Sequence, residues 1–392
     1  MYRNEKITII VVAYNRIKPL KRLLTSLNEA NYFDDKVTLY ISIDNGDNEP
    51  VLELANNFDW LHGKKIINYN KSNLGLKKHI IKCGDLSNEF DNIIILEDDT
   101  FVSNDFYNYA KSTLEFYKED KSIAGISLYS QRINEISNLP FLPIHDSNDV
   151  FFFKLPASSG QLWTKNQWNN FKSWYNNYNE DISCSNKLPN NIKKWPESSW
   201  KKYFALYMQE EDKYFVYPQH SLSTNFGEEG THALQNSNRH QTPLLFSFDY
   251  TNFNLAFLEE SKAVYDIYYE NEALYDYLHK KFDICPEEIT IDLYGQKSND
   301  LFKRYVLTSR KCNYLSLASF ANRLYPHELN ILKNIKGKAF HLYDTQNSID
   351  HKNRSFNLIN FNDRYNRLKY FYSKLSFKDI VVMLLGKIKG KL

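Results

Sequence analysis

The sequence has few cysteines and few glycines, and it has no long apolar run. Its four cysteines are spread over 392 residues without a Cys-x-x-Cys pair, which argues against a disulfide framework or a zinc site and favours a reducing compartment. The N-terminal residues lack the apolar stretch of a signal peptide. No window approaches the roughly 18 to 20 apolar residues of a membrane span. We therefore expect a cytoplasmic protein.

Neither sign of charge is in excess. Lys and Arg number 49 and Asp and Glu 47, so the formal net charge is +2. Nucleic-acid binding normally requires a clustered basic face, so we expect no nucleic-acid partner. Hydrophobic residues at 42% and aromatic residues at 16% supply material for a packed core. The length suits two or three domains.

The first third of the chain alternates strand-like and helix-like segments. Residues 7–13 form a continuous β-branched run of the kind buried on both faces of a parallel sheet. Residues 19–30 then repeat Leu at helical spacing, and further strand-like runs cover 37–43, 65–69 and 92–96. This alternation predicts an α/β fold with a doubly wound sheet, in which ligands bind beyond the carboxyl ends of the strands.

We expect one domain over residues 1–250. Its first part would cover about 1–130 and its second part about 131–250, where Trp, Tyr, Asn and Ser are dense in short elements.

Residues 251–392 predict a C-terminal region of mixed α/β or helical structure without an assigned role, and 289–341 could hold a small α/β subdomain. The tail, 376–392, combines apolar residues with lysines. That pattern is typical of an interfacial helix, so one hypothesis is a peripheral contact with the inner face of the plasma membrane. A helix buried on its own domain is the alternative.

The acidic trio Glu97-Asp98-Asp99 directly follows an apolar strand-like run. Three adjacent carboxylates repel one another unless a cation lies among them. Mg²⁺ or Mn²⁺ takes carboxylate and phosphate oxygens together, and it would neutralise a departing diphosphate. A solvated turn, or the N-terminus of a following helix, is the alternative interpretation.

Other polar residues follow neighbouring strands. Tyr14 could stack on a base, Arg16 could contact a phosphate, and Asp44 could accept hydrogen bonds from a base or ribose. Each alone is compatible with an ordinary capping turn, but they share one edge of the predicted sheet. The candidate residues for nucleotide binding are Ala13, Tyr14, Arg16, Asp44, Asn73, Gly75, Lys78, Glu97 and Asp98.

The ordered segments TIIVVAYNR, SIDN, NLG and IIILEDD resemble the nucleotide-binding half of inverting, bacterial family 2-like glycosyltransferases of the GT-A fold. The EDD segment is also similar to that of N-acetylglucosaminyltransferase I. The resemblance implies that Asp99 engages the Mn²⁺ or Mg²⁺ ion and that Asp44 recognises the base. It also implies a nucleotide-diphosphate sugar, UDP-linked, as the donor.

Residues 156–163 and 217–232 resemble the acceptor-side segment and the YP…NxG…GTH block of bacterial sugar transferases. The resemblance implies hexosyl or N-acetylhexosaminyl transfer to a glycan acceptor in surface polysaccharide or glycoconjugate synthesis. A lipid-linked acceptor would make a membrane contact of the tail useful. His232 of this block could complete the metal shell, although a lone loop histidine is more often a surface residue.

The catalytic base is where the sequence departs from the family pattern. In N-acetylglucosaminyltransferase I a Trp-Pro segment leads to tryptophan and aspartates, whereas Lys201 and Lys202 follow Trp200 here. An inverting transfer needs a carboxylate near the acceptor hydroxyl. The first candidate is Glu197, followed by Glu228, Glu229 and Glu211. A Pro-Glu pair such as Pro196-Glu197 is also typical of a first helical turn.

Four tryptophans could be platforms for sugar rings or core residues: Trp163, Trp168, Trp195 and Trp200. Two other functions stay open. A sugar nucleotidyltransferase is disfavoured because the turn after the first strand has no glycine. A non-catalytic nucleotide-sugar or glycan-binding module is compatible with the two lysines.

Overall fold

The computed structural model describes residues 6–46, 48–228, 240–246 and 252–349. The chain divides into two compact units, Met1–Ala273 (unit 1) and Leu274–Leu392 (unit 2). Three predicted features lie outside the described residues: Glu229, His232 and the tail 376–392. No helix in the described part of the chain is long and apolar enough to cross a membrane.

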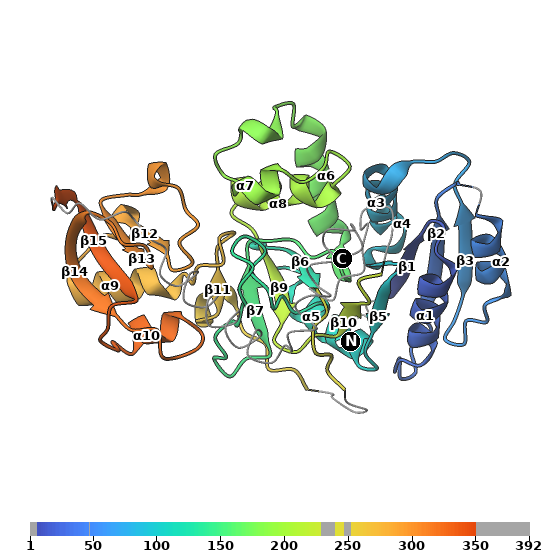
Figure 1. Cartoon of the computed structure of the whole chain (residues 1–392). Helices are drawn as coiled ribbons and strands as arrows, with labels where there is room; N and C mark the ends of the chain where they lie inside the picture. The colour runs from blue at the N-terminus through green and yellow to red at the C-terminus, as the bar shows by residue number, and fades with distance from the viewer. Residues whose placement is uncertain (1–5, 47, 229–239, 247–251, 350–392) are drawn as a thin grey trace, which may run out of the picture. The chain divides into compact units, whose positions relative to one another are not determined.

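Unit 1 is built on a nine-stranded sheet with the order β11-β7-β9-β6-β8-β4-β1-β2-β3 (Figure 1). Strands β1 to β4 are parallel, and β8 joins them antiparallel to both β4 and β6. The α/β class with a mixed sheet is confirmed. The strands are β1 (Ile7–Ala13), β2 (Thr38–Ile43), β3 (Lys65–Tyr69), β4 (Asn92–Glu97), β6 (Ile123–Ser127), β7 (Val150–Phe153), β8 (Gln161–Thr164), β9 (Tyr214–Pro218) and β11 (Val264–Tyr265).

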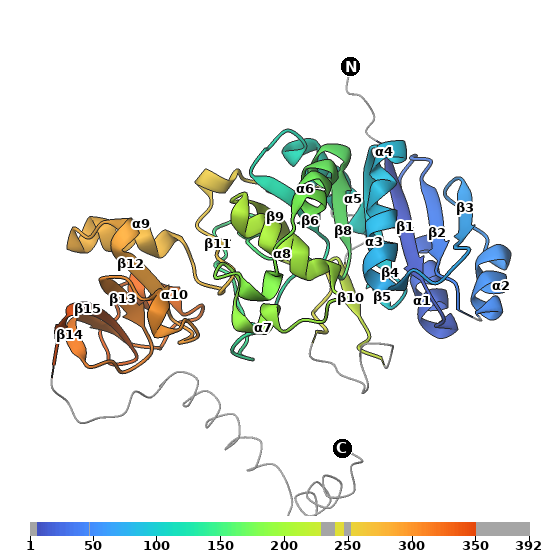
Figure 2. The same cartoon turned by 90° about the horizontal axis from the view of Figure 1, so that it is seen from above.

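Helices cover both faces of this sheet. On one face, alternate residues of β1 share a core with α1 (Ile17–Asn28) and α5 (Phe106–Tyr117), whose apolar side chains recur at helical spacing. On the other face lie α3 (Gly75–Asp85), α6 (Lys165–Asn177) and α8 (Trp200–Glu210), and Figures 1 and 2 show α6 and α8 side by side. The shorter helices of unit 1 are α2 (Glu49–Asn57), α4 (Ser87–Phe90) and α7 (Asn190–Lys193).

The core under α6 and α8 is aromatic. Trp163, Trp168 and Trp200 are fully buried, and the ring centroids of Trp163 and Trp168 are 5.0 Å apart. Three of the four candidate sugar platforms are therefore core residues. Trp195 is half-buried and lines a pocket.

The acidic trio ends β4 and forms a turn into β5 (Thr100–Val102) rather than a helix, since α5 begins only at Phe106. β5 pairs antiparallel with β10 (Ser223–Asn225), and Asn225 lies opposite Thr100. This pairing brings the segment around residue 225 to the end of β4.

Unit 2 holds a four-stranded sheet with the order β12-β13-β15-β14. Its strands are β12 (Ile289–Asp292), β13 (Tyr305–Thr308), β14 (Tyr314–Phe320) and β15 (Phe340–Ser348), with helices α9 (Ala273–Phe282) and α10 (Glu328–Leu332). The sequence places the boundary near residue 250, but β11 still pairs with β7. That pairing extends unit 1 to Ala273.

Candidate functional site

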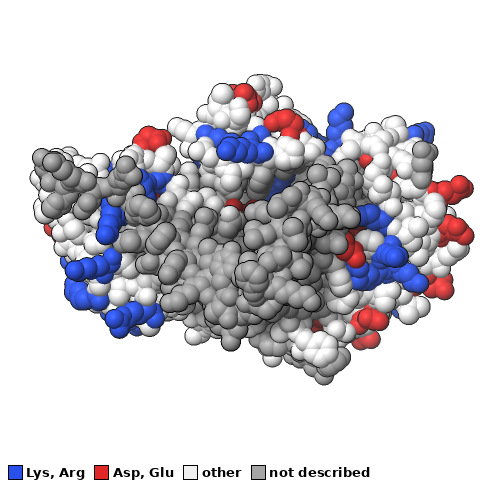
Figure 3. Space-filling view, in the orientation of Figure 1, with Lys and Arg blue, Asp and Glu red and all other residues white. Residues whose placement is uncertain are grey.

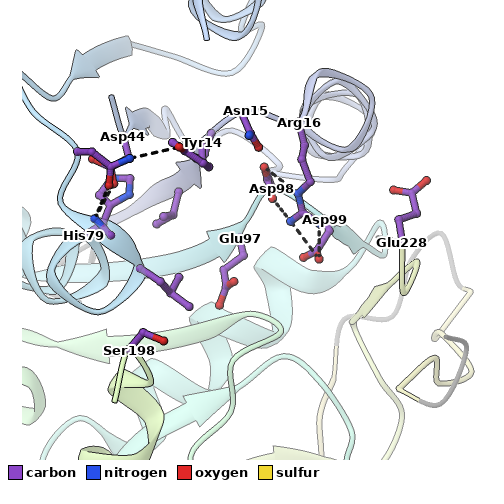
Figure 4. A pocket seen from close by; sticks show the side chains of 15 residues that line it. Tyr14, Asn15, Arg16, Asp44, His79, Glu97, Asp98, Asp99, Ser198 and Glu228 are labelled. Atoms are coloured by element: carbon purple, nitrogen blue, oxygen red, sulfur yellow. Dashed lines mark hydrogen bonds and ion pairs between the residues drawn. The ribbon is translucent and has the colours of Figure 1, made fainter. Parts of the chain in front are cut away.

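A pocket of about 360 Å³ lies beyond the carboxyl ends of β1, β2 and β4 (Figure 4). Strands of an open α/β sheet commonly present a ligand crevice at this edge. We call it the central pocket. It is lined by Val12, Ala13, Tyr14, Asn15, Arg16, Asp44, Asn73, Gly75, Leu76, His79, Glu97, Asp98, Asp99, Ser198 and Glu228.

The structure thus brings together eight of the nine candidate nucleotide-binding residues, together with Asp99 and Glu228. The exception is Lys78, which is exposed and does not line the central pocket. Sequence reasoning missed His79 and Ser198. His79 is one helical turn beyond Gly75, and that spacing could have indicated it. Nothing in the sequence singles out Ser198.

Arg16, just before α1, is held by the acidic turn. Its guanidinium donates to Asp98 and Asp99, and the contact to Asp99 Oδ2 measures 3.1 Å. Burial alone would lower the pKa of Arg16, but the two carboxylates raise it above its usual value. In this structure the guanidinium therefore holds carboxylates, whereas the sequence predicts a phosphate contact.

One guanidinium does not balance the three carboxylates. In the described part of the chain, Glu97 makes no hydrogen bond or ion pair, and its carboxyl points into the space between Ser198 and Asp99 (Figure 4). Burial, followed by the repulsion of Asp99 and Asp98, raises the pKa of Glu97 to about 8. Burial also raises the pKa of Asp98 to about 6, against the attraction of Arg16. The turn therefore has unsatisfied affinity for a cation.

These residues fit a divalent ion that is shared with a ligand. Among the described residues, no group of three or more His, Cys, Asp or Glu side chains is arranged to hold a metal alone. Mg²⁺ is typically bound by one or two carboxylates together with substrate phosphates. The side chain of Asp99 is 26% exposed and has a single ion-pair partner, so it keeps open coordination positions. We therefore expect Asp99, with Glu97 beside it, to hold such an ion.

Asp44 anchors the loop that leads into α3. Its carboxylate accepts hydrogen bonds from the backbone N–H groups of Leu74 and Gly75, both at 2.9 Å, and Asp44 is 3% exposed. The loop in turn places Asn73 so that its Nδ2 donates to the Tyr14 hydroxyl at 3.3 Å. Asp44 thus builds the wall of the pocket, and recognition of a base by Asp44 stays a prediction.

The ring of Tyr14 packs directly over Gly46. A Cβ atom at position 46 would lie 2.3 Å from Tyr14 Cε2, so we expect Gly46→Ala to displace the ring from the pocket. A nucleoside diphosphate should then bind about tenfold more weakly, measured by calorimetry, with little change in the melting temperature. Gly63→Ala, remote from the pocket, is the control for backbone strain: its clash is with Val37. Equal loss of affinity in both variants would contradict a role for Tyr14.

His79 is buried at the floor of the pocket, where its Nε2 lies 2.8 Å from Ser42 Oγ. Burial lowers the pKa of His79 to about 4, although Asp44 opposes this shift. The imidazole is therefore neutral at pH 7.

The imidazole of His79 binds a proton more readily in the unfolded chain than in the folded one, because its pKa is lower in the folded state. The contribution of His79 to stability is therefore present above about pH 6.5 and is lost as the pH falls towards 4. From pH 7 to pH 5 we expect wild type to lose about 2 kcal/mol more unfolding free energy than His79→Gln, which keeps a partner for Ser42. Urea titrations at the two pH values measure this difference. An identical loss in both proteins would show that His79 is not held neutral.

The structure separates the predicted bases. Glu197 is exposed in the turn before α8, accepts from Lys202 Nζ at 3.0 Å and from the Tyr203 hydroxyl at 3.2 Å, and does not line the central pocket. Glu228 lines the pocket, where Arg22 donates to both its oxygens at 3.0 and 2.6 Å. The hydrogen bonds from Arg22 lower the pKa of Glu228.

No protein-family model matches the sequence. A curated relative, the alpha-1,3-mannosyl-glycoprotein 2-beta-N-acetylglucosaminyltransferase of Arabidopsis thaliana, is 22% identical over 156 residues, which are 40% of this chain and 29% of the relative. Solved structures similar to the chain include S. aureus TarS 1-349 in complex with UDP-GlcNAc, at 12% identity and TM-score 0.39, covering 58% of this chain and 60% of TarS.

Another is the mannosyltransferase PcManGT from Pyrobaculum calidifontis in complex with GDP-Man and Mn²⁺. It has 13% identity and TM-score 0.32, and the match covers 44% of this chain and 47% of that protein. In all three cases the match spans less than two thirds of the relative's length.

Proposed function

We propose that the chain is a glycosyltransferase that moves a sugar from a nucleoside-diphosphate donor to a hydroxyl of a glycan acceptor. The observation that carries the proposal is the acidic turn. Among the described residues Glu97 has no hydrogen-bond or ion-pair partner, and Asp99 is partly exposed. Both line the central pocket, whose opposite end is formed by Tyr14, Asn73 and Asp44. The ordered sequence motifs and the curated relative support the same class.

In this proposal, Tyr14 and Asn73 contact the nucleoside and the diphosphate lies towards Asp99. A bound Mn²⁺ or Mg²⁺ would neutralise the negative charge that develops on the departing diphosphate. Arg16 positions Asp98 and Asp99 through its ion pairs. The buried floor of the pocket, with neutral His79, excludes water from the donor.

The transfer forms a bond from the acceptor oxygen to the anomeric carbon and breaks the bond from that carbon to the diphosphate oxygen. We propose that this displacement inverts the anomeric centre. The hydroxyl proton passes to a carboxylate, and Glu228 is the predicted base that lines the pocket among the described residues. Its hydrogen bonds to Arg22 lower the pKa of Glu228 and weaken it as a base, so in this proposal the acceptor hydroxyl replaces Arg22 as its partner.

A UDP-linked hexose or N-acetylhexosamine as donor, and a surface polysaccharide or lipid-linked glycan as acceptor, extend the proposal. They rest on the family resemblance of the sequence motifs. The described side chains on the visible face of unit 1 include both basic and acidic residues (Figure 3), whereas a polyanion such as nucleic acid favours a clustered basic face.

Calorimetry with UDP and GDP, each with and without Mn²⁺, tests the proposal, followed by release of nucleoside diphosphate from a panel of nucleotide sugars. We expect the ion to strengthen binding of one nucleotide by at least about tenfold. Absence of binding to every nucleotide, with or without the ion, would overturn the assignment.

A non-catalytic nucleotide-sugar-binding module is the second candidate. It is favoured by the pairing of Glu197 with Lys202 and of Glu228 with Arg22, since neither carboxylate is free. Ion-dependent binding without turnover of any nucleotide sugar, in water or with glycan acceptors, would support the module over the enzyme.

A further inference from the structure

A second pocket of unit 1, of about 440 Å³, adjoins the central pocket, and we call it the side pocket. Ser198 lines the central pocket and Ser199 the side pocket. Asn225 of the side pocket pairs across β10 and β5 with Thr100, the residue after Asp99. A ligand in the side pocket would therefore lie next to the donor's diphosphate end. Its volume suits one or two sugar rings.

Lys201 is a half-buried residue of the side pocket that makes no ion pair with a described residue, although its charge acts on the Glu97 carboxyl and opposes the rise in the pKa of Glu97. Its ammonium group lies 5.1 Å from the centre of the Trp195 ring. No carboxylate in the described part of unit 1 lies within ion-pair distance of it. The next residue, Lys202, is in contrast buried and is paired with Glu197 at 3.0 Å. Lys202 is thus structural, whereas Lys201 is available to a ligand.

The first turn of α8 adds to the positive potential at this point. Ser199 is the N-cap residue of the eleven-residue α8, and its hydroxyl accepts from the N–H of Lys202. A helix N-terminus carries partial positive charge and favours an anion nearby. Lys201 and the N-terminus of α8 therefore both contribute positive potential to the same wall of the side pocket.

The other polar groups of the side pocket suit a sugar. The Oδ1 atom of Asn225 is buried and has no hydrogen-bond partner in the described part of the chain, so it can accept from a ligand hydroxyl. The Trp195 ring offers an apolar face. A carboxylate, a histidine and a tyrosine also line the pocket: Glu135, His240 and Tyr129. Glu135 lies 3.5 Å from the Gln131 amide that donates to it, and His240 accepts from the Tyr129 hydroxyl through its backbone carbonyl.

We propose that the side pocket binds the acceptor as a sugar with an anionic substituent, a carboxylate or a phosphate, which pairs with Lys201 while the sugar ring lies against Trp195. This inference rests on the proposed function, because it takes the side pocket as the acceptor part of the same site. The negative substituent would pair with the ammonium group of Lys201, which has no ion-pair partner in the described part of unit 1. The sugar hydroxyls would satisfy Asn225.

Binding of three small probes to the full chain tests the charge preference: methyl glucuronide, glucose 6-phosphate and methyl glucoside, titrated by ligand-observed NMR in the presence of a nucleoside diphosphate. We expect at least one anionic probe to bind about tenfold more tightly than the neutral glucoside, as for a charge-assisted hydrogen bond. The anionic probe that binds more tightly than the neutral glucoside identifies the substituent as a carboxylate or a phosphate. Equal affinity for all three probes would overturn the proposal.

Variants assign the preference to Lys201. Lys201→Met keeps the contact with Trp195 but removes the charge, so the ratio of the affinity for the anionic probe to that for the neutral glucoside should fall from about ten to about one. Lys201→Arg keeps the charge and should keep this ratio. Lys77→Met is the matched control, because Lys77 also lies over an aromatic ring, 4.7 Å from the centre of Tyr203, but lines neither pocket. A ratio that survives in Lys201→Met would overturn the assignment to this residue.

Nucleotide titrations on the same variants separate this inference from the proposed function. We expect the affinity for the nucleoside diphosphate to change less than twofold in Lys201→Met. A loss equal to the loss of probe binding would show that Lys201 contacts the diphosphate instead, which contradicts the inference but not the proposed function. Charge-selective probe binding in a protein that binds no nucleotide would contradict the proposed function alone.

Discussion

Replacing Asp99 by Asn is expected to abolish most of the ion-dependent binding of nucleoside diphosphate and to lower turnover by about 100-fold or more. The physical reason is that Asp99 is the member of the acidic turn with an open carboxylate, and an amide oxygen is a much weaker ligand for a hard divalent cation. Loss of the ion leaves the charge of the departing diphosphate uncompensated. Calorimetry and nucleotide release, each with and without Mn²⁺, measure the two effects.

Two comparisons make this result specific. Affinity for the nucleotide in the absence of the ion should change less than about threefold, because the proposed nucleoside contacts are Tyr14 and Asn73 rather than Asp99. Asp59→Asn, an exposed carboxylate outside both pockets, should behave as wild type. Full ion-dependent binding in Asp99→Asn would remove the acidic turn from the mechanism.

Replacing Arg16 by Met is expected to lower the free energy of unfolding by about 3 kcal/mol at pH 7, because it leaves Asp98 buried without its cation. Without Arg16, the pKa of Asp98 should rise further, because burial then acts on this carboxyl without the attraction of the guanidinium. The folded state would then bind more protons than the unfolded chain, so the deficit should shrink as the pH falls from 7 towards 4. Urea denaturation across this pH range measures the change.

The double variant Arg16→Met, Asp98→Asn tests the cause. It should recover most of the lost stability, since the buried charge is removed together with its partner. Arg22→Met provides a matched control, because its pair with Glu228 is more exposed and should contribute less than about 1 kcal/mol. Equal losses for Arg16→Met and Arg22→Met, or no recovery in the double variant, would contradict this account of the acidic turn.

The fold of the N-terminal half was largely predictable. Continuous β-branched runs such as Ile7–Ala13 are buried on both faces only in a sheet covered by helices, so their spacing predicts the parallel strands. The α/β character of unit 2 was also predictable. The edge strand β11 was not, since Val264–Tyr265 is two residues long and is defined by its pairing with β7. This short pairing moves the unit boundary to Ala273.

The site was predictable in its position but not in its contacts. Parallel strands that end together must bring Tyr14, Asp44 and Asp99 to one edge. Which groups face each other there depends on long-range contacts. Arg16 donates hydrogen bonds to Asp98 and Asp99, which are more than 80 residues away in sequence. The Asp44 carboxylate accepts hydrogen bonds from the backbone N–H groups of Leu74 and Gly75. The residues adjacent in sequence do not predict these long-range hydrogen bonds.

The sequence by itself determined the alternation of strands and helices, and with it the acidic turn at the end of a central strand, because burial and periodicity are local properties of the chain. Only the tertiary structure decided which charges are compensated. Two adjacent lysines are alike in sequence, yet Lys202 is buried against Glu197 whereas Lys201 stays unpaired over Trp195. The difference arises because pairing requires atoms within a few ångströms, and packing of distant segments sets that distance.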